Sequence, residues 1–177
     1  MKRTIINIVL IVLIFIIYYL QVNFFDWFTI AGVMPNIFII LVLFIGLFGT
    51  KSMGIIYGVS IGLVLDVLVG QQVGITAVVF GIIGFVAGMF DKNFSKDNRM
   101  TIMIMVLCST ILAEITIAIL KYVFVQANID ILSFIKILGI EVIYNLIITI
   151  IIYPLIQKFG YYIENEYKGN KILTRYF

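Results

Sequence analysis

Two glutamates lie well inside long apolar stretches of the sequence, where an ionised side chain is costly. Glu114 is near the middle of one stretch, and Glu141 is well inside the next. A charge that faces lipid near the bilayer centre costs roughly 2.5 kcal/mol or more, so we expect each carboxyl to face the bundle interior, a cavity or a partner. Asn145 follows Glu141 by four residues, so the two can present one polar patch. If Glu114 and Glu141 are adjacent, one should carry a proton, because close like charges oppose each other.

A third carboxylate ends a regular row of glycines in another apolar stretch. Three glycines and Asp66 follow one another at four-residue intervals, which places them on nearly one face of a helix. Glycine rows let a second backbone approach closely in lipid, and the following segment carries such a row as well. The expected helix-packing interface consists of Gly54, Gly58, Gly62, Asp66, Gly84 and Gly88. We interpret it as a partner interface, although the spacing also allows the two helices to pack on each other.

Residue types that support most catalysis and metal binding are scarce. Histidine is absent, which removes the commonest general base and metal ligand, and Cys108 is the only cysteine. The sequence contains no HExxH motif and no paired-aspartate motif. We therefore expect no enzyme activity, no metal site and no cofactor. The net charge of +3 is small, and we expect no nucleic-acid partner.

The composition is far too apolar for a soluble domain of this length. Hydrophobic residues make up 63% of the 177 positions and charged residues only 12%, with a mean hydropathy of +1.21. Apolar stretches recur from end to end, and helices are the elements that satisfy their own backbone groups in lipid. The sequence therefore predicts an all-α polytopic membrane protein with a single transmembrane domain over residues 1–177.

Six apolar segments can be marked as expected transmembrane helices. They cover residues 4–25, 31–48, 53–69, 74–89, 100–125 and 131–155, and a short basic tail follows at 156–177. The third and fourth segments are close to or below the ~17–25 residues that a spanning helix needs. We expect both to span fully. The alternative is a partly inserted hairpin that the longer helices shield from lipid.

The basic residues predict the orientation. Under a six-span topology two lysines, Lys121 and Lys136, fall on the outer side, where their long stems can carry the ammonium groups to the headgroups. The other ten fall on one side: Lys2, Arg3, Lys51, Lys92, Lys96, Arg99, Lys158, Lys168, Lys171 and Arg175. Because basic residues are retained in the cytoplasm, both termini are expected there.

The central part of the sequence carries a recognisable order of motifs. Pro35 and Asn36 open the second segment, the glycine row follows, and the phrase GLVLDVLVGQQVG at residues 62–74 contains Asp66. In this order and spacing, residues 35–89 resemble the rod shape-determining protein MreD of bacteria. Many members carry an aspartate where this sequence has Asn36, so a charge cannot be essential at that position.

This resemblance implies a role in building the lateral cell wall. Members are non-enzymatic subunits of the elongation machinery in the bacterial cytoplasmic membrane and help to maintain rod shape. The implied direct partner is the scaffold protein MreC. MreB, RodA and the elongation-specific transpeptidase are implied as further partners, with the lipid bilayer as the surroundings.

The family's fold is similar to that of the six-helix substrate-binding subunits of energy-coupling-factor vitamin transporters, and this similarity supplies an alternative function. A vitamin site would need polar and aromatic groups that converge from several helices. Few residues of the expected spans could line such a site. Scaffolding is therefore the preferred interpretation.

Overall fold

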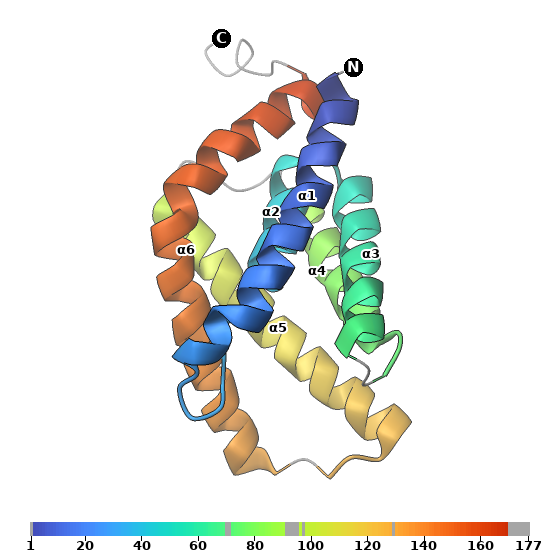
Figure 1. The fold of residues 1–177 in the computed structure, drawn as a ribbon, viewed down its shortest axis with the longest axis vertical. Coiled ribbons are helices and arrows are strands. Elements are labelled where there is room, and N and C mark those ends of the chain that lie inside the picture. Colours follow the sequence, from blue (N-terminus) through green and yellow to red (C-terminus); the bar gives the residue numbers. More distant parts are fainter. Residues whose placement is uncertain (1, 70–71, 91–95, 97, 129, 170–177) are drawn as a thin grey trace.

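The computed structural model describes residues 2–69, 72–90, 96, 98–128 and 130–169, and these residues form a bundle of α-helices (Figure 1). A 3₁₀ turn, η1 (Phe25–Phe28), follows the first helix. The α-helices are α1 (Lys2–Asn23), α2 (Ile37–Phe48), α3 (Lys51–Val69), α4 (Ile75–Phe90), α5 (Arg99–Val125) and α6 (Ile131–Lys168). The predicted all-α fold is thus confirmed for the described part of the chain.

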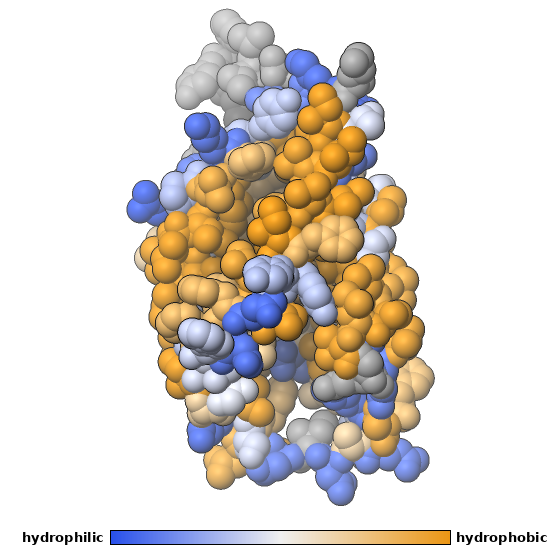
Figure 2. All heavy atoms as spheres, viewed as in Figure 1, coloured by the Kyte–Doolittle hydropathy of each residue, from blue (hydrophilic) through white to orange (hydrophobic). Residues whose placement is uncertain are grey.

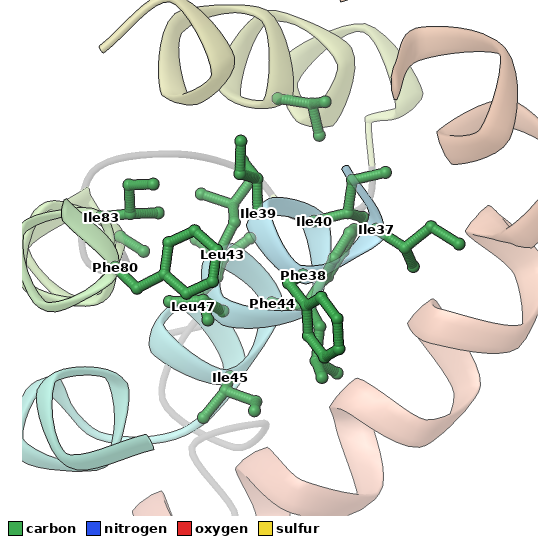
Figure 3. Close-up of a cluster of buried hydrophobic side chains, with 14 of the residues drawn as sticks. Ile37, Phe38, Ile39, Ile40, Leu43, Phe44, Ile45, Leu47, Phe80 and Ile83 are labelled. Atoms are coloured by element: carbon green, nitrogen blue, oxygen red, sulfur yellow. The ribbon is translucent and has the colours of Figure 1, made fainter. Parts of the chain in front are cut away.

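Helix α2 is the centre of the bundle. All twelve of its residues are buried, and it contacts each of the other five α-helices. A helix that is apolar on every face is stable only where other elements surround it, and IFIILVLFIGLF is such a sequence. Figure 3 shows its side chains pointing outward in several directions, with Phe80 and Ile83 of α4 packed against them.

The start of α2 differs from the prediction. The apolar segment expected at 31–48 is helical only from Ile37, because Pro35 disfavours helical geometry at the residue before it. The preceding residues instead form a tight turn, in which Ile30 and Val33 pair and Gly32 has a φ of +79°. At 12 residues α2 is about 18 Å long, shorter than the ~30 Å hydrocarbon core.

Within the part of the chain that the structure describes, four helices are long and apolar enough to cross a membrane: α1, α3, α5 and α6. The shorter apolar helices α2 and α4 accompany them inside the bundle. Apolar residues cover most of the face seen in Figure 2, and hydrophilic residues gather toward its upper and lower ends and in a smaller group near the end of α1. The chain is accordingly a multi-pass membrane protein. Full spanning by six segments remains a prediction.

The last helix continues beyond the predicted boundary at residue 155. Pro154 lies inside α6, yet the helix runs on to Lys168, so residues 156–168 of the expected tail are helical. This extension packs beside the start of α1: the hydroxyl of Tyr167 donates to Asn7 Oδ1 at 2.8 Å, and Lys2 pairs with Glu166 at 3.2 Å. Figure 1 shows these two helix ends side by side. The remainder of the tail, 170–177, lies outside the described residues.

Candidate functional site

The glycine row of α3 faces α4. A Cβ atom added to Gly58 would overlap the carbonyl oxygen of Phe80, and one added to Gly62 would overlap the backbone of Ala77. Gly54 meets the backbone of Gly84 in the same way. In the structure α4 of the same chain fills this face, which is the packing of the two helices on each other that the spacing also allows.

The second glycine row completes this packing. Gly84 faces Gly54, and a Cβ on Gly88 would lie 2.6 Å from Cα of Lys51. Gly46 of α2 lies in the same region, where an added Cβ would be 2.7 Å from the Gly84 carbonyl oxygen. The two rows therefore hold the three helices α2, α3 and α4 at close backbone distance. Dispersion and weak polar contacts stabilise such packing in lipid.

Asp66 caps the start of α4. The side chain is buried, and its carboxylate accepts hydrogen bonds from the backbone N–H groups of Gly74, Thr76 and Ala77, at 2.8, 3.3 and 3.3 Å. The first N–H groups of a helix have no partner within it, and the positive end of the helix dipole favours a negative charge there. Asp66 thus fixes the turn between α3 and α4 rather than ending an exposed surface.

Asn145 joins three parts of the bundle at the start of α2. Its Oδ1 accepts from the backbone N–H of Asn36 at 2.8 Å, and its Nδ2 donates to Thr110 Oγ1 of α5 at 3.0 Å. Both Asn145 and Thr110 are fully buried. The next N–H, that of Ile37, donates to Gln21 Oε1 of α1 at 3.1 Å. Side chains from two helices, α1 and α6, therefore satisfy the backbone where α2 begins inside the bundle, and Thr110 of α5 holds Asn145 in place.

The two intramembrane glutamates lie next to each other beside Asn145. The carboxyl groups of Glu114 and Glu141 interact directly, and Glu141 also faces the side-chain amides of Asn36 and Asn145. Glu141 is 5% exposed, and its Oε1 has no hydrogen-bond partner among the described residues. Glu114 is only partly buried. We call Asn36, Glu114, Glu141 and Asn145 the polar cluster.

Three residues that position these groups were not expected from the sequence as site residues. Thr110 is a single hydroxyl residue in an apolar stretch, and Gln21 lies near the end of the first segment. No sequence pattern around either residue marks it as part of a site. Asn36 is marked in the sequence only by its place after Pro35. The sequence could predict Glu141 and Asn145 as one patch, but not the partners that α5 and the start of α2 bring to it.

A cavity of about 200 Å³ lies between α4 and α5, and its walls are mostly apolar. Ile104, Cys108 and Leu112 of α5 contribute to it.

Among the described residues, no group of three or more histidine, cysteine, aspartate or glutamate side chains could hold a metal ion.

The sequence comparisons identify one family. The family model described as rod shape-determining protein MreD matches residues 2–163, which is most of the chain. Comparisons with curated proteins and with solved structures give no match.

Proposed function

This chain belongs to the family of rod shape-determining protein MreD, and from that premise we propose that it is a non-enzymatic scaffold that binds MreC in the cell-wall elongation machinery. The family match carries the proposal, and it identifies the chain as a cell-shape-determining membrane protein. MreB, RodA and the elongation transpeptidase would join the complex directly or through MreC.

The arrangement of the bundle supports a scaffold. The α2–α3–α4 core is packed backbone to backbone and offers a rigid support. Large apolar side chains are exposed on α1, α3, α5 and α6, and of these helices α5 and α6 carry a glutamate well inside their apolar stretch. Helices in a membrane associate through such faces and through polar groups within them. We therefore place the partner surface on α5 and α6, and not on the glycine rows.

We propose that both termini lie in the cytoplasm and that the membrane is the bacterial cytoplasmic membrane. The excess of basic residues at one end supports this orientation. Reporter fusions test it. A fusion at the end of α6 should report a cytoplasmic location, and one inserted after Gln126 should report the outer side. A C-terminal fusion that reports the outer side would reverse the assignment of every loop.

Cells that depend on this chain for growth test the function itself. We expect depletion to convert rods into round cells and re-expression of the chain to restore rods, because the lateral wall would no longer elongate. Cell length and width measured by microscopy are the readout. Normal rods after complete depletion would contradict a shape-determining role in that organism. Tight binding of a vitamin by the purified chain would instead favour the transporter-like alternative.

A further inference from the structure

The polar cluster contains two adjacent carboxyl groups without a cationic partner. Glu114 and Glu141 interact with each other, and within the described part of the chain neither lies within ion-pair distance of a lysine or arginine. The Oε1 atom of Glu141 is buried with no hydrogen bond. A buried polar atom that lacks a partner destabilises the folded chain. This unsatisfied atom indicates that the carboxyl pair has room for a further binding partner.

The lysines nearest along the sequence do not fill the position. Lys121 is on the same helix as Glu114 and contributes only a distant electrostatic attraction, and Lys136 lies on α6 ahead of Glu141. Both lysine side chains are exposed, as expected for stems that extend toward the headgroups.

The polar cluster is accessible from outside the bundle at Glu114, whose side chain is only partly buried. Figure 1 shows that α5 and α6 diverge toward the loop that connects them, and Figure 2 shows a gap in the surface between their lower ends. On these two helices large apolar side chains are substantially exposed, among them Ile115 and Ile119 of α5 and Ile137 and Ile143 of α6.

We propose that Glu114 and Glu141 form the docking site for a lysine or arginine side chain carried by a transmembrane helix of the partner. The proposal rests on the proposed function and adds the chemistry of the contact. A cation between the two carboxyls would neutralise their repulsion and satisfy the Oε1 atom of Glu141. Apolar residues of the same partner helix would cover the exposed faces of α5 and α6.

The depth of the cluster favours a helix-borne side chain over a lipid amine. Glu141 lies ten residues inside α6 and Glu114 eleven residues before the end of α5, which places both about 15 Å along their helices. A headgroup amine stays at the interface, roughly half a hydrocarbon thickness away. A divalent metal ion would normally recruit more oxygen ligands than two carboxyls supply.

Glutamine variants test the site, since they retain the side-chain shape and remove the charge. The experiment compares Glu114→Gln, Glu141→Gln and the double variant, with Asp26→Asn as control, because Asp26 is an exposed carboxylate on the outer turn. Two quantities are measured for each variant. The first is the amount of MreC recovered with the tagged chain from solubilised membranes, and the second is the thermal unfolding midpoint of the chain alone. We expect the double variant to recover at least tenfold less MreC while its midpoint stays equal or rises, because an unsatisfied carboxyl has been removed. The control should change neither quantity.

A charge exchange identifies the partner residue. Glu141→Lys should abolish recovery, and changing one basic residue in the transmembrane segment of MreC to glutamate should restore it. A photo-reactive residue at Ala118, one turn from Glu114, should form a crosslink to MreC in intact cells that the double variant lacks.

Four results would overturn the inference while leaving the proposed function intact: unchanged MreC recovery by the double variant, a fall in recovery together with the midpoint, crosslinks to lipid alone, or a midpoint of the unaltered chain that rises with added Na⁺ or Ca²⁺. If the unaltered chain recovers no MreC, the proposed function fails. In that case the protein crosslinked at Ala118 tests the inference. If changing a basic residue in its transmembrane segment to glutamate restores binding to Glu141→Lys, the inference is supported. Any other crosslinked product contradicts it.

Discussion

Replacing Gly58 with leucine should leave little folded protein. A side chain at this position would overlap the carbonyl oxygen of Phe80, which belongs to the backbone of α4 and cannot rotate away. Overpacking of well-packed interiors costs about 1–3 kcal/mol when side chains can adjust, and a backbone obstacle removes that adjustment. We expect the variant to insert but to lose its cooperative thermal transition in detergent. Fluorescence-detected size exclusion and thermal unfolding measure this loss.

Gly139 of α6 provides the matched control. It is also a glycine inside an apolar helix, but no atom lies within 4 Å of an added Cβ. Gly139→Leu should therefore retain the thermal midpoint of the unaltered chain. If Gly58→Leu remains as stable as Gly139→Leu and loses only its partner, the glycine row would be an outward docking surface after all.

Replacing Asp66 with alanine should destabilise the chain by about 2 kcal/mol or more, since three backbone N–H groups at the start of α4 lose their acceptor. Asp66→Asn should cost less, because the amide oxygen can still accept, although the favourable charge near the helix N-terminus is lost. The thermal midpoints of the two variants measured side by side test this order. Asp26→Ala serves as control and should have no effect. An Asp66→Ala variant as stable as the unaltered chain would show that the cap contributes nothing.

The sequence could predict the tight α3–α4 pair because both glycine rows are local patterns in neighbouring segments. It could not decide which surface the rows face. That depends on how α2 places Gly46 between them, and every position of α2 is apolar, so its pattern marks no preferred face.

The capping role of Asp66 could not be predicted from the sequence either, because its hydrogen-bond partners are distant along the chain. An N-cap is usually recognised directly before its helix, whereas Asp66 precedes Gly74 by eight residues and reaches it only across a turn. The start of α2, in contrast, could be predicted from Pro35, which lies two residues before it.

The extension of α6 could not be predicted, because a proline such as Pro154 normally ends a helix. In the structure the helix continues through Pro154 to Lys168.

Glu114 and Glu141 show most clearly which features of the site cannot be predicted from the sequence. Their depth could be predicted from the sequence, and so could their need to avoid lipid. Their adjacency depends on the rotation of α5 and α6 about their axes, which no pattern within either helix specifies.

The central claim is that this chain is a membrane scaffold that binds MreC through α5 and α6. The most direct test is binding between the purified chain and purified full-length MreC, both reconstituted in lipid nanodiscs and measured by a fluorescent label on MreC. We predict saturable binding that is competed by unlabelled MreC. The control variant Asp26→Asn should bind unchanged, and bulky polar substitutions at Ile115 or Ile143 should abolish binding. A chain with an intact thermal transition that shows no saturable binding would contradict the account.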